Sequence, residues 1–304
     1  MKHKKNLFFL IGCAGYIAKR HVEAIHKLKN SELISVFDPS SNVGYLDSFS
    51  FKINYFSNFD DFVNNLNNFN KSISNKYLVI CSPNNTHVNY IKFGLKNNFK
   101  IICEKPICIK KKEYEYLLSL NELEKNNVYS LLQLRYSKSI YKIKKYFSSI
   151  IKINKSRKII KLKYVTPRGK WYFNTWKGDP KRSGGILLNI GIHLFDFLIF
   201  IFGEPMNYKM TSYRSNKSSG YLIFNGFKVM WYLSLDINDI KKNNNKSIRA
   251  LYTDQKSFEL SENFEDLHLS SYKSILSSKK SNLLDSLKSI NLVINILNKY
   301  KNDT

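Results

Sequence analysis

A strand, a glycine-rich turn and a helix follow one another at the start of the chain, and this succession constrains the fold most. Residues 7–11 form a continuous apolar run, typical of a central parallel strand covered on both faces. The run leads directly into a turn with Gly12, Gly15 and Ala18, then a helical stretch to about residue 28. Such a turn lets a pyrophosphate approach the helix N-terminus. Because the spacing is wider than Gly-x-Gly-x-x-Gly, an ordinary tight turn stays open as the alternative.

A second strand, over residues 33–37, ends at Asp38. An acidic residue about twenty positions after a glycine turn accepts hydrogen bonds from the adenosine ribose and repels a 2′-phosphate. We therefore predict NAD rather than NADP as the cofactor. The alternative is that Asp38 only opens an Asp-Pro turn. The predicted cofactor contacts here are Gly12, Gly15, Tyr16, Ile17 and Asp38.

Strands and helices keep alternating through the first part of the chain. We predict helices at residues 59–69, 86–95 and 110–125, and strands at residues 77–81, 100–103 and 128–133. Alternation of this kind predicts an α/β fold with a doubly wound parallel sheet. We assign residues 1–126 to an N-terminal Rossmann dinucleotide-binding domain.

The pattern changes after about residue 135. A basic helix near residues 139–148 is followed by strand-like runs that succeed one another with few helices between them, and the tail at 283–299 has helical apolar spacing. The predicted strands are residues 158–165, 208–213, 220–224, 227–236, 247–253 and 257–260. We predict that residues 127–304 form an α+β domain on a mainly antiparallel, open-faced sheet.

Polar residues follow two of the predicted parallel strands. Ser82 and Asn84 come after one strand, and Glu104-Lys105-Pro106 comes after the next. Ligands bind beyond the carboxyl ends of such strands, so both segments are candidates for a site. The Lys105 ammonium can stabilise a developing alkoxide, or act as the base itself if burial lowers its pKa.

Three polar residues interrupt the apolar segment at residues 183–202. Asn189, His193 and Asp196 stand four and three apart, which places them on one face of a helix. His193 suits proton transfer because its ordinary pKa lies near working pH. Asp196 either orients the His193 ring or makes a structural contact. The segment approaches the length of a short membrane span, but its polar residues favour a buried core helix.

Composition restricts the function classes. The net charge of +26 arises mainly from lysines spread along the chain, and Asn, Ile, Phe and Tyr are also abundant. Biased codon usage explains this as well as a nucleic-acid partner would, so we predict no nucleic-acid binding, although a basic surface attracts anionic substrates. The four cysteines show no metal-site spacing, so we expect reduced thiols and no metal. No secretory signal is recognised, and we expect a cytoplasmic protein that does not insert into a membrane.

The glycine turn, Glu104-Lys105-Pro106, and Gly184-Gly185 followed by Asn189 and His193 together resemble the glucose–fructose oxidoreductase/inositol dehydrogenase (Gfo/Idh/MocA) family. The resemblance covers nearly the whole chain. Further motifs are similar to the UDP-N-acetylglucosaminuronate 3-dehydrogenase branch: residues 12–21, 81–84, 132–135, 176–179, 189–193 and 264–273. Most of the wider family has Asp where this chain has Asn189, which makes Asn189 a hydroxyl-orienting group rather than a base.

The resemblance implies NAD-dependent oxidation of the sugar C3 hydroxyl of UDP-2-acetamido-2-deoxy-D-glucuronate, in surface polysaccharide (O-antigen/LPS) biosynthesis. Lys105 and His193 are the implied catalytic residues. Together with Arg168, Lys177 and Asn189 they are also the implied substrate contacts. Additional implied cofactor contacts are Ser82, Asn84, His87, Glu104, Lys105, Gln133 and Trp171. A cis bond before Pro106 is common in similar turns.

Two other functions stay open. One is oxidation of a different sugar or of inositol, and the other is NAD binding without catalysis. The resemblance also implies a homo-oligomer, a dimer or tetramer, formed through the open face of the C-terminal sheet. The pathway partner is a PLP-dependent aminotransferase that consumes the 3-keto product.

Overall fold

The computed structural model describes residues 5–50, 52–69, 74–153, 158–241, 244–260, 267–277 and 282–303. The chain forms two compact units. Unit 1 comprises Met1–Cys108, Glu115–Gln133 and Asp266–Leu284, and unit 2 comprises Ile109–Tyr114, Leu134–Glu265 and Asp285–Thr304. A segment near the C-terminus thus belongs to the same unit as the N-terminal residues.

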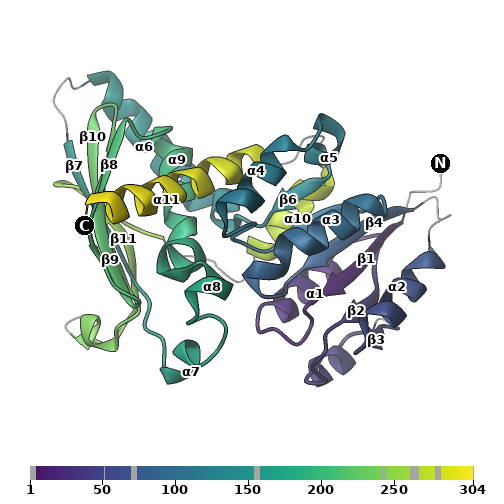
Figure 1. Ribbon diagram of the computed structural model, residues 1–304. Helices are drawn as coiled ribbons and strands as arrows, with labels where there is room; N and C mark the ends of the chain where they lie inside the picture. Colours follow the sequence, from purple (N-terminus) through teal and green to yellow (C-terminus); the bar gives the residue numbers. More distant parts are fainter. Residues whose placement is uncertain are drawn as a thin grey trace. The chain divides into compact units, whose positions relative to one another are not determined.

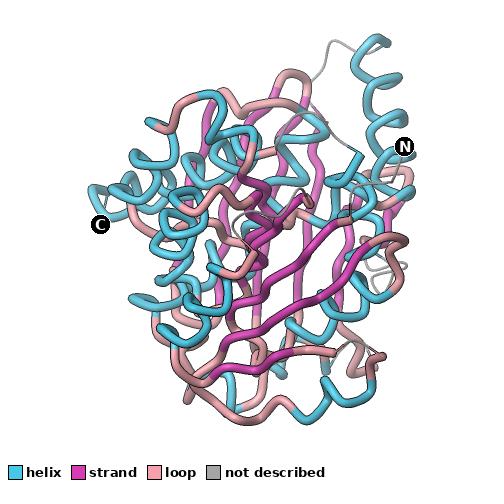
Figure 2. The backbone as a smooth tube through the Cα atoms, turned by 90° about the vertical axis from the view of Figure 1, so that its right-hand side faces the viewer, coloured by secondary structure: helices cyan, strands magenta, loops and turns pink. Residues whose placement is uncertain are grey.

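Unit 1 is built on a six-stranded parallel sheet with the order β3-β2-β1-β4-β5-β6 (Figures 1 and 2). Parallel strands with crossover helices are the Rossmann-type arrangement that the alternating pattern predicts. The expected strands are present, and β3 adds a short edge strand that the sequence did not indicate. The strands are β1 (Asn6–Ile11), β2 (Ser31–Phe37), β3 (Asn54–Phe56), β4 (Asn75–Ile80), β5 (Lys100–Cys103) and β6 (Val128–Ser130).

Helices cover both faces of this sheet. On one face Phe8, Tyr77 and the fully buried Tyr272 of α10 form an aromatic core with apolar residues of α1. On the other face Phe9 packs edge-on against Phe99. The helices of unit 1 are α1 (Ala18–His26), α2 (Phe59–Asn67), α3 (His87–Lys96), α5 (Glu122–Asn126) and α10 (Leu267–Ser277), with short 3₁₀ turns at Gly44–Ser48 and Asn84–Thr86.

The single helix predicted at residues 110–125 is divided in two. Helix α4 (Lys111–Ser119) ends before Asn121, which caps α5. The Asn121 side chain accepts from the Glu124 N–H, while the Glu124 carboxylate accepts from the Asn121 N–H. This capping box starts a new helix, because it satisfies N–H groups that a continuous helix would bond internally.

Unit 2 is built on a second six-stranded sheet, with the order β12-β11-β7-β10-β9-β8. Only β10 and β7 pair in parallel, so the prediction of a mainly antiparallel sheet is confirmed. The strands are β7 (Lys158–Val165), β8 (Asn207–Tyr213), β9 (Lys217–Phe224), β10 (Phe227–Ser234), β11 (Ile248–Tyr252) and β12 (Ser257–Glu259).

Helices α6, α9 and α11 lie on one side of this sheet (Figure 1). Strand β7 alternates exposed and buried residues, with Ile159 and Lys161 exposed while Ile160 and Leu162 are buried. Such alternation is typical of a sheet with one covered and one solvated face. The helices of this part are α6 (Lys138–Ile153), α7 (Lys170–Phe173), α8 (Pro180–Ser183), α9 (Ile192–Phe202) and α11 (Leu283–Asp303), with 3₁₀ turns at Gln133–Tyr136 and Ile237–Asp239.

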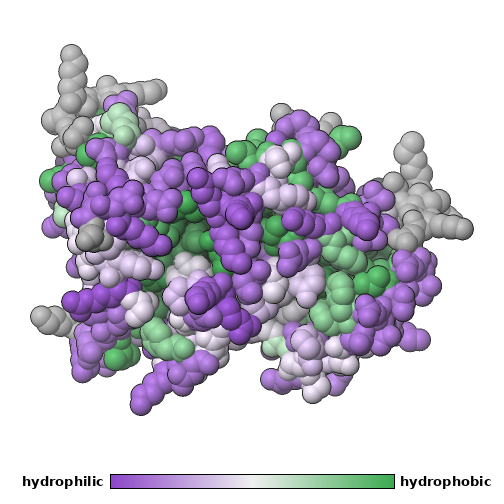
Figure 3. Space-filling model, viewed as in Figure 1, coloured by the Kyte–Doolittle hydropathy of each residue, from purple (hydrophilic) through white to green (hydrophobic). Residues whose placement is uncertain are grey.

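The apolar segment Pro180–Phe202 is long and apolar enough to cross a membrane, but 83% of its most apolar window is buried in the structure. It therefore has the burial of a core helix. Figure 3 shows hydrophilic side chains spread widely over the face in view, with hydrophobic side chains between them. All four cysteines are buried and outside any disulfide, and Cys13, Cys81 and Cys103 lie at or next to strand ends as expected.

Candidate functional site

The glycine turn of unit 1 brings two strand ends together and leaves a helix terminus open. Gly12 has φ of +89°, and a Cβ there would lie 2.5 Å from the Ser82 backbone nitrogen. Ile17, the N-cap of α1, provides no side-chain cap, and the first turn of α1 has no acidic residue. The positive end of the helix is thus available to an anion. Tyr16 in the same turn is 78% exposed, which is unusual for an aromatic side chain.

Asp38 folds back toward the glycine turn. One carboxylate oxygen accepts from the Ala14 N–H at 3.0 Å, and the other accepts from the Ser40 N–H at 2.9 Å. Each oxygen keeps a lone pair for a further donor such as a hydroxyl. Beyond Asp38 lies an open hollow of about 550 Å³, lined by Val43, Leu46, Tyr55 and neighbouring residues. The Tyr55 hydroxyl donates to the Asp38 backbone oxygen at 3.1 Å.

His87 connects the ends of β4 and β5. Its two ring nitrogens lie within hydrogen-bond distance of the backbone oxygens of Ser82, at 2.9 Å, and of Pro106, at 2.8 Å, and the neutral ring donates to one of them. The Ser82 hydroxyl is 2.7 Å from that of Thr86, and Asn84 is buried at the start of the following 3₁₀ turn. These bonds fix the loop after β4 against the turn that contains Lys105.

Glu104 and Lys105 follow β5, and the Lys105–Pro106 bond is cis, as the resemblance implies. The Glu104 side chain is buried beside His21 and His268. Burial alone would raise the pKa of Glu104. The hydrogen bond from His21 and the nearby ring of His268 outweigh it and hold the pKa well below its usual range. Glu104 is therefore a buried carboxylate immediately before the predicted catalytic lysine.

Gln133 lies just after β6, at the end of unit 1. Gln133 is only 6% exposed, and its side-chain oxygen has no hydrogen-bond partner among the described residues. A buried acceptor without a partner is costly unless a ligand or water satisfies it. Gln133 is thus a candidate to accept a hydrogen bond from a bound group.

The predicted catalytic helix of unit 2 begins in an irregular way. Gly184 and Gly185 have φ of +83° and +72°, and the following five residues, Leu187–Gly191, form a π-helix before α9. A Cβ at Gly184 would lie 2.8 Å from that of Leu188, so glycine is required for this tight entry. Wide helical turns of this kind are frequent at functional sites. The sequence pattern predicted the helix but not its π segment.

Asn189 and His193 are both buried, at 7% and 8% exposure, and Asn189 has a defined orientation. Its amide nitrogen donates to the Tyr172 hydroxyl oxygen at 2.7 Å. The hydroxyl proton of Tyr172 is then free to be donated elsewhere. The residue is 3% exposed and contacts the predicted substrate residue Asn189.

A group of positive and aromatic side chains precedes this helix. Arg168 donates to Thr166 and to the Pro167 backbone oxygen, and the described residues give it no carboxylate partner. Burial, and then the charge of Arg168, lower the pKa of Lys177. Lys177 Nζ lies 5.4 Å from the ring centre of Trp171, which is 55% exposed. Cations without acidic partners favour an anionic ligand.

Asp196 does not orient His193. Arg135 donates to both Asp196 oxygens, each at 2.7 Å, and Ser289 donates to one of them at 2.8 Å. The structure therefore decides between the two alternatives for Asp196, since its carboxylate is engaged in a buried ion pair within unit 2. Arg135 belongs to a motif that the resemblance identified without a role.

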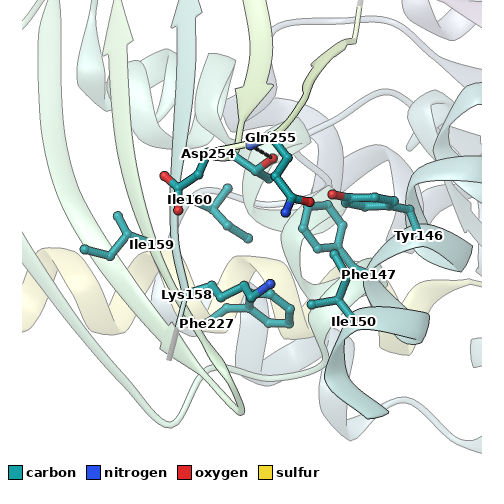
Figure 4. A pocket seen from close by; sticks show the side chains of 10 residues that line it. Tyr146, Phe147, Ile150, Lys158, Ile159, Ile160, Phe227, Asp254 and Gln255 are labelled. Carbon is teal, nitrogen blue, oxygen red and sulfur yellow. Dashed lines mark hydrogen bonds between the residues drawn. The ribbon is translucent and has the colours of Figure 1, made fainter. Parts of the chain in front are cut away.

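The most enclosed cavity described is elsewhere in unit 2. It has a volume of about 50 Å³ and lies between α6 and the sheet, where Tyr146, Phe147 and Phe227 point into it (Figure 4). None of the predicted site residues lines it. Ligand pockets for drug-sized molecules are several times larger, at about 300 Å³ or more. This cavity is a packing defect rather than a site.

The fold, the nucleotide-binding features and the polar helix agree with one family of enzymes. Residues 7–131 match the oxidoreductase family with an NAD-binding Rossmann fold (GFO_IDH_MocA), and residues 158–226 match its C-terminal alpha/beta domain. The chain belongs to this family of NAD-dependent oxidoreductases.

Several proteins of known structure are similar to this chain over most of its length. The chain is 33% identical to the WlbA (WbpB) dehydrogenase from Thermus thermophilus, crystallised with NAD and UDP-GlcNAcA, with a TM-score of 0.84 and coverage of 95% of this chain and 93% of that one. A second structure of that protein contains NAD and alpha-ketoglutarate. WlbA from Bordetella pertussis has the same fold, with a TM-score of 0.78 at 15% identity, covering 100% of this chain and 98% of that one.

Glucose-6-phosphate 3-dehydrogenase of Bacillus subtilis (strain 168) is 27% identical over 197 residues. This alignment covers 62% of the present chain and about half of the curated relative, 52% of its length.

Proposed function

We propose that this protein oxidises the sugar C3 hydroxyl of UDP-2-acetamido-2-deoxy-D-glucuronate with NAD, as a cytoplasmic step of surface polysaccharide (O-antigen/LPS) biosynthesis. The observation that carries the proposal is the similarity, over 95% of the chain, to a dehydrogenase crystallised with NAD and UDP-GlcNAcA. The cations of unit 2 support it, because the proposed substrate carries a diphosphate and a carboxylate.

The residues of unit 1 fit NAD. The uncapped terminus of α1 suits the pyrophosphate, and Asp38 has lone pairs for the ribose hydroxyls. Val43 and Leu46 line the hollow beyond Asp38, which suits the adenine. The partnerless Gln133 oxygen would accept from an amide or hydroxyl of the cofactor. When bound, NAD accepts the hydride from the sugar carbon.

The side chains of the protein have to accept the proton of the C3 hydroxyl group and stabilise the oxygen that loses it. Oxidation of the C3 hydroxyl releases its proton, which a base of the protein has to accept. We assign His193 as the acid/base group and Lys105 as the ammonium that stabilises the alkoxide and relays the proton. Asn189, oriented through Tyr172, would donate to or accept from a sugar hydroxyl. Arg168 and Lys177 would bind the acidic groups.

The direct test is NADH formation by purified protein with the UDP-uronate, alone and coupled to a PLP-dependent aminotransferase that consumes the 3-keto product. A 2-oxo acid is included as a second acceptor, in case bound NADH blocks turnover. Lys105→Ala and His193→Ala should each reduce kcat by about 10²–10⁴-fold while NAD still binds. Lys110→Ala, an exposed lysine of the same segment, is the matched control. Full activity in either site variant would remove that residue from the chemistry.

A second candidate is oxidation of a sugar phosphate, favoured by the similarity to glucose-6-phosphate 3-dehydrogenase. Both substrates carry phosphate, so the cations alone do not separate them. Parallel assays with glucose 6-phosphate, the UDP-uronate and free inositol rank the candidates by kcat/KM. NAD binding without turnover of any of the three would instead favour the non-catalytic alternative.

A further inference from the structure

The turn that presents Lys105 rests on a buried polar cluster that no part of the proposed mechanism uses. His21 comes from α1, Glu104 from the end of β5, and His268 and Tyr272 from α10. All four residues belong to unit 1 and are at most 6% exposed. Residues 266–284 lie outside the two family matches at 7–131 and 158–226, so half of this cluster is contributed by a segment without an assigned role.

The hydrogen bonds of the cluster determine where its protons lie. Burial lowers the pKa of His21, which favours the neutral ring with a single proton. The Glu104 carboxylate only accepts, so His21 Nε2 carries that proton and donates to Glu104 at 3.0 Å. His21 Nδ1 then accepts from the Tyr272 hydroxyl at 2.8 Å. His268 Nε2 approaches the same Glu104 oxygen at 3.5 Å.

The second carboxylate oxygen of Glu104 bonds the turn that contains Lys105. It accepts from the backbone N–H of Lys105 at 3.1 Å. On the other side of Lys105, the His87 ring nitrogen Nδ1 lies 2.8 Å from the carbonyl oxygen of Pro106. The backbone on both sides of Lys105 is therefore fixed by buried side chains of the unit.

We infer that Glu104 is a positioning residue that sets the location of Lys105. His21 holds it by a hydrogen bond, Tyr272 of α10 orients the His21 ring, and His268 of α10 lies 3.5 Å from the same Glu104 oxygen. This inference rests on the proposed catalytic role of Lys105. Its chemistry requires a carboxylate at position 104, because two separate oxygens have to accept hydrogen bonds from different sides. An amide of the same size has only one acceptor oxygen and loses one of the two bonds.

The same atoms need to be considered as ligands of a metal ion. His21, Glu104 and His268 each offer one ligand atom within 4.8 Å of the others. The 3.0 Å separation of His21 Nε2 and Glu104 is that of a direct hydrogen bond, and ligands of a tetrahedral zinc with bonds of about 2.1 Å stand farther apart. The proton on His21 Nε2 also occupies the lone pair that a metal would need. We therefore assign a hydrogen-bonded carboxylate.

The test compares Glu104→Gln, His268→Gln and Tyr272→Phe with Lys273→Ala, an exposed residue of α10. Displacement of a catalytic group by about 1 Å costs up to about 10²-fold in rate. We expect kcat to fall by about that factor in Glu104→Gln and roughly ten-fold in the α10 variants. Substrate KM and NAD affinity should stay within about three-fold, and Lys273→Ala should match the wild type. Unchanged kcat in Glu104→Gln and Tyr272→Phe would overturn the inference.

Hydrogen–deuterium exchange gives a measurement that needs no substrate, so its result is independent of the proposed function. Peptides covering residues 104–108 should exchange faster in Glu104→Gln and Tyr272→Phe, while those of β1 and β4 do not. Equal exchange at 104–108 in all variants would contradict the inference even if the enzyme is active. If Glu104→Gln does not fold, Tyr272→Phe decides, because it removes one oxygen and keeps the ring. Stoichiometric zinc in the purified protein, lost in His268→Gln, would replace the positioning role by a metal site.

Discussion

Removal of the Asp196 carboxylate should destabilise unit 2 without a direct effect on the chemistry. Arg135 binds two carboxylates at the same distance, with two bonds to Asp196 and one to Asp285, all of 2.7 Å. The partners differ in burial, with side-chain exposures of 1% for Asp196 and 52% for Asp285. Loss of one partner of a buried pair costs about 3–5 kcal/mol. Loss of an exposed partner costs about 0–1 kcal/mol, because solvent screens the pair.

The two variants Asp196→Asn and Asp285→Asn therefore form a matched pair around one guanidinium. Urea unfolding can be followed by tryptophan fluorescence, because all three tryptophans lie in unit 2 and Trp231 packs against Phe195 with ring centres 5.4 Å apart. We expect a loss of about 3–5 kcal/mol for Asp196→Asn and less than about 1 kcal/mol for Asp285→Asn.

Equal losses in the two variants, or no loss at Asp196, would refute the argument from burial. Activity provides the second measurement. The folded fraction of Asp196→Asn should turn over substrate at close to the wild-type kcat, with the same pH profile. A loss of kcat in fully folded Asp196→Asn would instead indicate that Asp196 orients His193.

Three further outcomes are expected. Asp38→Ala should weaken NAD binding by about ten-fold or more and reduce the preference for NAD over NADP, because the acceptor for the ribose hydroxyls and the repulsion of a 2′-phosphate are both lost. Unchanged affinity for both cofactors, measured by calorimetry, would contradict the role of Asp38 in cofactor binding. Stability should fall as pH drops below about 6.5, the ordinary pKa of histidine, because the unfolded chain takes up a proton that buried His21 resists. It should fall further as pH drops below 4.5, the ordinary pKa of glutamate, because the unfolded chain then takes up a proton that Glu104 resists. The dependence should be weaker in His21→Asn and unchanged in His26→Asn, as measured by urea midpoints across pH. Ile159 of β7 and Met230 of β10 are 50% and 44% exposed, so we expect a homo-oligomer that forms through this open sheet face. Light scattering should show a smaller species for Ile159→Glu than for the wild type. A monomeric wild-type protein at micromolar concentration would exclude such an oligomer.

Much of the fold was predictable because each main element has its own local signal. The apolar run at residues 7–11, the glycine turn and the Asp38 strand end lie within one crossover unit, and the structure pairs β1 with β2 as expected. The sequence pattern also located β7 to β12 closely. Strand β3 was missed because Asn54–Phe56 is three residues long, too short to show a period.

The candidate site was less predictable, because hydrogen-bond partners are distant in sequence. The spacing of Asn189, His193 and Asp196 suggested one polar stripe, but Asp196 bonds Arg135 and Ser289 instead. No local pattern indicates that Tyr172 contacts Asn189, that Tyr272 bonds His21, or that His268 lies beside Glu104. Motif likeness assigned a role only to Gln133 in segment 132–135 and to no residue in segment 264–273. Residues 264–266 of the latter lie outside the described residues.

The return of α10 to unit 1 has a consequence for synthesis of the protein. Tyr272 and Ile275 complete the core that contains Phe8 and Val22, so this core lacks a wall until about residue 277 has been translated. A nascent chain that ends near Gln133 would expose apolar side chains on one side of its sheet, which favours aggregation or chaperone binding. For the same reason a recombinant fragment cut after the parallel sheet would be a poor source of an isolated cofactor domain. A fusion of residues 1–133 to 266–284 through a flexible linker would restore the missing wall.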